Sequence, residues 1–156
     1  SCRTASKRLK ELDSVPSFVD RNGGTPFILY RKDRIAALQG TEHLSEFRLT
    51  PKSKTRRVIA TCCNTPVFLE FQGGHWLSLY GCLWPEGSAP PPDLRTMTSD
   101  LPADSSLPDD ILNCKRQSGR FMLKLLGAWI AMGFRVPKIT YVERALDLPA
   151  EVPLSS

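Results

Sequence analysis

Two adjacent cysteines, Cys62 and Cys63, are the residues of this chain with the most specific chemistry. One β-like run precedes them and another follows, which places both thiols at the end of a strand. Thiolates are zinc ligands, and one turn can direct two of them at a single ion. Two other interpretations of the pair stay open: buried thiols without a metal, and a vicinal disulfide, which forces an unusual peptide geometry.

A structural zinc site needs four thiolate or imidazole ligands in a tetrahedron. Cys2 is the candidate for a third ligand, and Cys82 is a further candidate because it follows a predicted strand. Cys114 falls in a predicted helix, where a buried apolar role is favoured. For His43 and His75, which lack an Asp or Cys partner nearby in sequence, a structural or surface role is favoured. No complete catalytic constellation is present, so catalytic residues are not assigned.

A basic cluster provides a second candidate site, formed by Arg48, Arg56 and Arg57 with Lys52 and Lys54. On adjacent strands these side chains would bind a carboxylate, such as those of glutathione, or a phosphate. The other interpretation is a solvated sheet face and turn. The net charge is only +5. Nucleic-acid binding is not expected, because it usually requires basic residues gathered on one surface.

Composition predicts one domain in a reducing compartment. The chain has 156 residues, of which 41% are hydrophobic, enough for a core. Its five cysteines are an odd number, which argues against a disulfide framework. Residues 121–134 form the longest apolar stretch, but Lys124 interrupts it and it is too short for a bilayer. With no leader-like segment in view, we expect a cytoplasmic protein that does not contact membranes. A homo-oligomer is compatible with these features.

The local sequence pattern predicts a mainly β fold. A short helix is expected over residues 3–13. Runs rich in β-branched and aromatic residues, bounded by turn residues, predict strands over 27–30, 47–49, 56–61, 67–71 and 76–80. Because no long helices separate these runs, the strands should form a compact antiparallel sheet.

The second half of the chain predicts a loop and then a helix. Residues 85–109 are rich in proline and read as a loop. Ser106 is the predicted N-cap of the helix, Pro108 to Asp110 suit its first turn, and Gly133 is the predicted stop. The apolar face of the helix is expected to pack on the sheet. The predicted organisation is a β domain at 1–84, a loop at 85–109, and a helix and tail at 110–156 on the same domain.

Three segments together resemble the family of glutathione-dependent formaldehyde-activating enzymes and centromere protein V, closest to an uncharacterised bacterial branch. The segments are Cys2 with the helix after it, Gly24-Thr25-Pro26-Phe27, and Cys63-Asn64-Thr65-Pro66. The resemblance covers residues 1–84. Two positions depart from the family pattern: Ala60 stands where a cysteine is expected, and Asn64 replaces a glycine, although asparagine can also adopt a left-handed turn.

The resemblance implies a small antiparallel zinc-knuckle-type β fold with zinc as cofactor. Cys2, Cys62 and Cys63 would be metal ligands, with Cys62 replacing the ligand missing at Ala60. The implied activity is a carbon–sulfur lyase acting on glutathione adducts, with a glutathione-like thiol as ligand. The alternative is a non-catalytic binding module with a structural metal or none, which the reduced number of cysteines favours.

Overall fold

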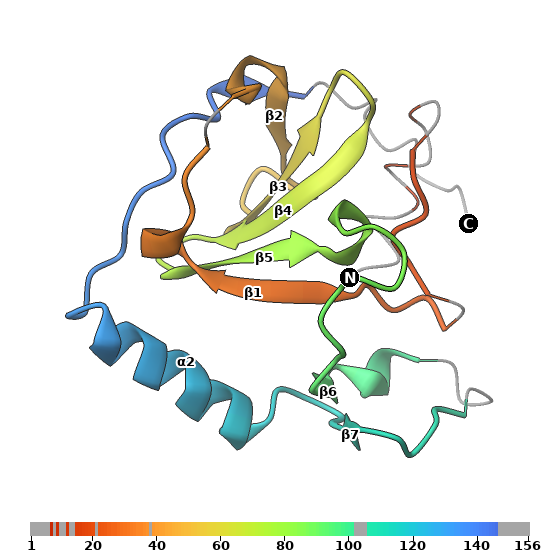
Figure 1. Ribbon diagram of the computed structural model, residues 1–156. Coiled ribbons are helices and arrows are strands. Elements are labelled where there is room, and N and C mark those ends of the chain that lie inside the picture. The colour runs from red at the N-terminus through yellow and green to blue at the C-terminus, as the bar shows by residue number, and fades with distance from the viewer. Residues whose placement is uncertain are drawn as a thin grey trace.

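A computed structural model of the chain describes residues 22–37, 39–101 and 106–146, together with residues 15–20 and the single positions Lys7, Leu9 and Leu12. The helix predicted over residues 3–13 lies mostly outside these residues, and so does Cys2. The main element of the described part is a six-stranded sheet, and the α-helix α2 (Gly119–Ala131) lies beside it (Figure 1).

Six strands form this sheet in the order β1-β5-β4-β3-β2-β8. Their bounds are β1 Phe27–Arg31, β2 Leu44–Phe47, β3 Thr55–Ala60, β4 Thr65–Phe71, β5 Trp76–Tyr80 and β8 Arg144–Ala145. All neighbouring strands are antiparallel except β2 and β8, which are parallel. The prediction of a mainly β fold with a largely antiparallel sheet is therefore confirmed.

Four of the five predicted strands coincide with β1, β3, β4 and β5 to within two residues at each end. The strand predicted at 47–49 is wrong except for Phe47, because β2 precedes it. The polar residues of β2 do not fit the apolar pattern by which strands are predicted. Ser45 is buried on one side of the sheet, and Glu46 is ion-paired on the other.

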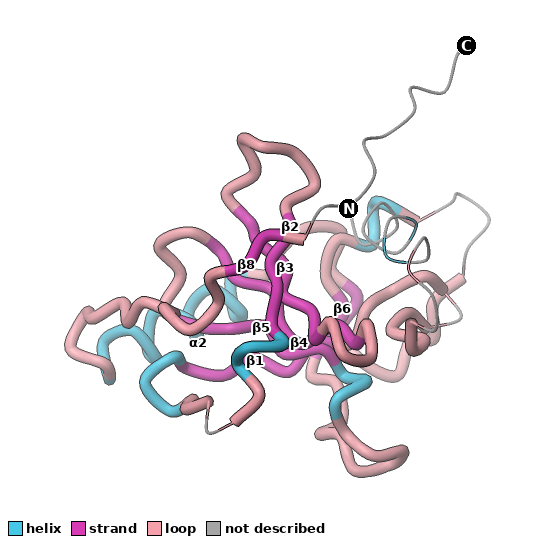
Figure 2. Tube along the Cα trace, turned by 90° about the horizontal axis from the view of Figure 1, so that it is seen from above, coloured by secondary structure: helices cyan, strands magenta, loops and turns pink. Residues whose placement is uncertain are grey.

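Both faces of the sheet are covered, because side chains alternate between them along each strand. We call the first the N-terminal face; Phe47, Ile59, Leu69 and Tyr80 pack there with Leu9 and Phe18. The second is the C-terminal face, where Val58, Phe68 and Leu77 pack with Val142. Seen from above, loops lie on both sides of the strands (Figure 2).

The remaining elements are short. The described residues include four 3-10 helices: η1 Lys32–Arg34, η2 Thr41–His43, η3 Gly81–Leu83 and η4 Thr98–Asp100. Strands β6 (Leu94–Arg95) and β7 (Leu112–Asn113) pair in parallel as a separate two-stranded sheet. Within the described part of the proline-rich segment predicted to be a loop, only β6 and η4 are regular elements.

Helix α2 spans Gly119–Ala131, so the predicted start near Ser106 is wrong. The N-cap is Ser118, whose Oγ accepts a hydrogen bond from Phe121 N at 3.1 Å. The segment before the helix is not helical: Leu112–Asn113 pair with β6, and Arg95 Nη1 lies 2.7 Å from Asp110 Oδ1. Cys114 consequently lies in a loop after β7, not in a helix. The predicted stop is confirmed by Gly133, whose φ of 62° ends the helix.

Helix α2 contacts the sheet mainly near the β4–β5 turn. His75 Nε2 lies 2.8 Å from Leu125 O, and the His75 ring stacks on Trp129 with centroids 5.9 Å apart. Leu125 is the only buried residue of the helix, while Leu123 is 69% and Ile130 53% exposed. The expected packing of the apolar face on the sheet is thus limited to one side of the helix. None of the helices in the described residues has the length and apolar character that crossing a membrane requires.

Candidate functional site

The cysteine pair lies at the tip of the β3–β4 hairpin, in a turn over residues 61–64. Thr61 fixes one side of the turn, since its N and Oγ1 both donate to His43 O, at 2.8 and 2.9 Å. Cys63 N donates to Ala60 O at 3.3 Å and closes the turn. Asn64 has a φ of 52°, the left-handed conformation expected from its side chain.

Both thiols are exposed, and their pKa values are shifted in opposite directions. Their Sγ atoms are 3.8 Å apart, and Cys63 Sγ also lies 3.1 Å from Thr65 Oγ1. The Thr65 hydroxyl, which can donate to the thiolate, lowers the pKa of Cys63. The hydrogen bond with Cys63 raises the pKa of Cys62. The interpretation of the pair as buried thiols is therefore wrong, and the two sulfurs are not joined in a disulfide in this structure.

One distance in the pair can be compared with that expected for two zinc ligands. Two thiolates on one tetrahedral zinc ion, each about 2.3 Å from the metal, lie about 3.8 Å apart. The observed separation of 3.8 Å between Cys62 Sγ and Cys63 Sγ matches this spacing. Within the described residues, no group of three or more His, Cys, Asp or Glu side chains is placed to hold a metal. The pair would therefore supply two ligands, and the predicted third, Cys2, lies outside the described residues.

The other candidate ligands, two cysteines and two histidines, do not join the Cys62–Cys63 pair in a metal-binding group within the described residues. Cys82 is half-buried in η3, where burial raises its pKa, and its Sγ lies 3.8 Å from Pro66 O. Cys114 is also half-buried. The His43 ring is exposed, with Nε2 3.4 Å from Glu42 Oε1. His75 is buried against α2, in keeping with the structural role favoured for it.

The structure does not gather the three arginines into one cluster. Arg56 and Arg57 are consecutive in β3 and therefore project from opposite faces of the sheet. Arg48, beyond the end of β2, donates from Nη1 to Ser53 O at 2.8 Å. The alternation of side chains along a strand was a signal in the sequence that could have separated Arg56 from Arg57.

Arg56 belongs to a buried ion-pair network on the C-terminal face, which we call the Glu70 network. Its Nε and Nη1 lie 2.5 Å from Glu70 Oε2 and Glu46 Oε2 respectively. Lys32 Nζ lies 2.5 Å from the other Glu70 oxygen. Arg56 Nη2 donates to Ile139 O at 3.0 Å, which attaches the segment after α2 to the sheet. With its donors used in this way, Arg56 has a structural role.

Arg57 contrasts with its neighbour. Its side chain lies on the N-terminal face and only 7% of the residue is exposed. Among the described residues, no acceptor is hydrogen-bonded to its Nε or Nη1. No local pattern indicates that only one of these two adjacent arginines forms ion pairs with described residues.

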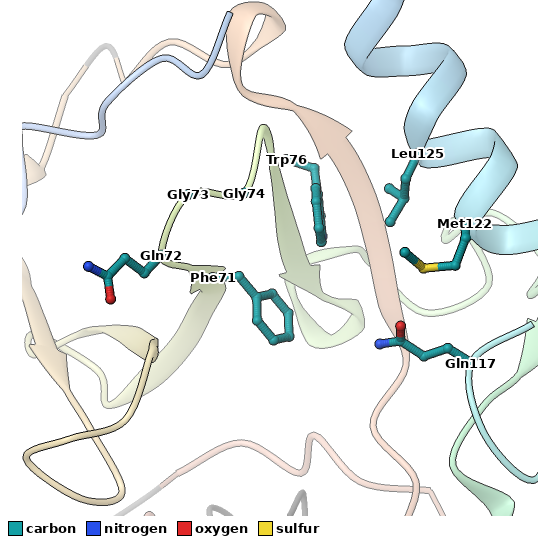
Figure 3. Close-up of a pocket in the computed structure, with 8 residues that line it drawn as sticks. All are labelled: Phe71, Gln72, Gly73, Gly74, Trp76, Gln117, Met122 and Leu125. Atoms are coloured by element: carbon teal, nitrogen blue, oxygen red, sulfur yellow. The ribbon is translucent and has the colours of Figure 1, made fainter. Parts of the chain in front are cut away.

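A pocket of about 300 Å³ lies between the β4–β5 turn and the first turns of α2. Figure 3 shows the side chains of Phe71, Trp76 and Met122 directed into a common space, with the Gln117 amide at its edge. The rings of Phe71 and Trp76 have centroids 5.9 Å apart at an angle of 39°. Sequence reasoning missed this pocket because its two walls come from distant parts of the chain.

The comparisons with known proteins do not extend this picture. No protein-family model matches the chain, and no curated protein or solved structure is significantly similar to it.

Proposed function

We propose that this protein is a zinc-binding β-sheet module whose metal is held at the tip of the β3–β4 hairpin. The observation that carries the proposal is the exposed Cys62–Cys63 pair, with its Sγ–Sγ separation of 3.8 Å. Cys63 would bind as the more readily deprotonated ligand because of Thr65. Cys2 is proposed as a further ligand.

A non-catalytic role has more support than the lyase activity. A lyase acting on glutathione adducts would need cations close to the metal to orient an anionic substrate. Arg56 lies four residues before Ala60, which places it about 13 Å along the strand from the hairpin tip. Its donors are also committed to Glu46, Glu70 and Ile139. If a coordination position is left open, zinc supplies a Lewis acid that polarises a bound group.

Zinc content tests the proposal. The full chain, purified with reductant and zinc, should carry about one zinc ion per chain, as in a four-ligand site. Cys62→Ser and Cys63→Ser should each lose most of it. Cys82→Ser is the matched control and should keep it, because this half-buried thiol is not grouped with the pair. Equal zinc contents in all four proteins, or none in the unaltered chain, would contradict the proposal.

The lyase version has its own assay. The zinc-loaded protein would be incubated with S-hydroxymethylglutathione, and turnover compared with that of the Cys63→Ser variant. We expect no turnover above background from either protein. Zinc-dependent turnover that Cys63→Ser abolishes would replace the non-catalytic module with the carbon–sulfur lyase that the family resemblance implies.

A further inference from the structure

Two of the three guanidinium nitrogens of Arg57, Nε and Nη1, are buried without a hydrogen-bond acceptor in the described part of the chain. Only 7% of the residue is exposed. Arginine cannot lose its proton in a protein, so the group stays charged. Burying an unpaired charge carries a large free-energy cost, and buried charges are normally paired. Among the described residues, Arg57 therefore has no anion beside it, although such a position calls for one.

The surroundings of Arg57 are apolar. Its cross-strand neighbours are Phe47 on β2 and Leu69 on β4, and both are buried. The adjacent Arg56, on the opposite face, has two carboxylates and a carbonyl on its guanidinium. The same sheet therefore gives an acceptor to each guanidinium nitrogen of Arg56, and among the described residues it gives none to Nε and Nη1 of Arg57.

The face that carries Arg57 opens to solvent one residue pair away. Thr55 and Phe71 pair across β3 and β4 on this face; Thr55 is partly exposed and Phe71 is 38% exposed. Phe71 and Trp76 also form walls of the pocket in Figure 3. Diagonal neighbours on one sheet face, such as Arg57 and Phe71, are about 7–8 Å apart and within reach of long side chains. An apolar surface and a buried cation thus lie next to each other.

We propose that Arg57 anchors a binding site for a monoanionic carboxylate with an apolar, preferably aromatic, body. The carboxylate accepts hydrogen bonds from the guanidinium, and the apolar body lies against Phe71 and Trp76. A carboxylate neutralises the single positive charge, whereas a phosphate dianion would leave a negative charge in apolar surroundings. This site is separate from the hairpin tip, so the carboxylate proposal does not depend on whether the cysteines bind zinc.

Thermal unfolding and tryptophan fluorescence of the full chain test the site, with benzoate and butyrate as probes. Benzamide is the neutral control for benzoate, inorganic phosphate is the dianion, and ionic strength is held constant. Benzoate should raise the melting temperature and change the fluorescence, and butyrate should do so more weakly; benzamide and phosphate should have little effect. No response to either carboxylate, or a stronger response to phosphate, would overturn the proposal.

Substitutions identify the residue responsible. Arg57→Met should weaken benzoate binding by about tenfold or more, because a hydrogen bond to a charged group is lost. Arg34→Met removes an exposed charge and should bind benzoate as the unaltered chain does. Arg57→Lys keeps a charge without the planar fork and should show an intermediate affinity. Unchanged affinity in Arg57→Met would refute the assignment.

Stability without ligand provides a second test. Arg57→Met should not lower the melting temperature, since it removes a charge that has no ion pair with any described residue. Arg56→Met should lower it, because Glu46 and Glu70 lose a partner. If Arg57→Met were as destabilising as Arg56→Met, Arg57 would already be neutralised within the chain, and no carboxylate ligand would be needed.

Discussion

Glu70 is the residue whose neutralisation should cost this fold the most stability for the smallest change in shape. It is 8% exposed and contacts two cations, with Arg56 Nε and Lys32 Nζ each 2.5 Å from one carboxylate oxygen. Glu70→Gln leaves Lys32, which is 4% exposed, as a buried charge without a carboxylate. Removing one partner of a buried ion pair typically costs about 3–5 kcal/mol. We expect the free energy of unfolding to fall by this amount.

Urea unfolding followed by tryptophan fluorescence measures the loss. With a denaturant slope of about 2 kcal/mol per molar, the midpoint should fall by about 1.5–2.5 M. Asp93→Asn is the matched control, because its ion pair with Lys124, at 2.9 Å, is exposed on both sides. An exposed pair contributes about 0–1 kcal/mol. The reasoning is refuted if Glu70→Gln costs no more than Asp93→Asn.

The Glu70 network also predicts that the stability losses of substitutions at Lys32 and Glu70 are not additive. Lys32→Met destabilises by leaving Glu70 short of a partner, and Glu70→Leu destabilises by leaving Lys32 without one. In the double variant neither charge is buried alone, and replacing buried ion pairs by apolar residues is often neutral. The double variant should therefore lose less stability than the sum of the two single losses. Strict additivity would show that the two side chains do not interact.

Two other predictions concern packing and thiol reactivity. A Cβ on Gly81 would lie 2.9 Å from Pro26 Cβ, so Gly81→Ala should destabilise by about 1–3 kcal/mol in urea unfolding. Gly127→Ala, in open space on α2, should instead be neutral or stabilise by up to about 1 kcal/mol; the opposite order would contradict the packing. Iodoacetamide, with modified sites located by mass spectrometry, should alkylate Cys63 before Cys82, since Cys63 is exposed and its pKa is lowered while burial raises that of Cys82. The difference should be largest just below the usual thiol pKa, and faster modification of Cys82 would count against the described burial.

The sequence predicted elements well where side-chain pattern and burial agree. β5 was predicted at its observed bounds because Trp76–Tyr80 is apolar or aromatic apart from one serine. β2 was misplaced because half of its inward positions are polar. The start of α2 was misplaced because acidic residues near Asp110 suit a helix N-terminus, but the ion pair between Asp110 and Arg95 is a tertiary contact that no local pattern reveals.

In the candidate site, too, the features set by local sequence could be predicted and those set by tertiary contacts could not. The hairpin tip followed from the position of Cys62 and Cys63 between two strands, and the left-handed turn followed from Asn64. The pairing of Arg56 could not be predicted, because its partners Glu46 and Glu70 come from β2 and β4, and Lys32, which pairs with Glu70, comes from a third element. The pocket near Phe71 depends on α2, which approaches the sheet only after a long excursion of the chain.

The parallel pairing of β8 with β2 has a consequence for the order of folding. β2 to β5 are consecutive antiparallel neighbours, so their contacts are local and can form early. β8 pairs with β2 from about a hundred residues later, and Leu146 N donates to Glu46 O at 2.8 Å. Until that segment has been synthesised and docked, the backbone groups of β2 form an open edge that another chain could pair with. The short length of β2 and the charge of Glu46 within it are features that generally oppose pairing at an exposed edge.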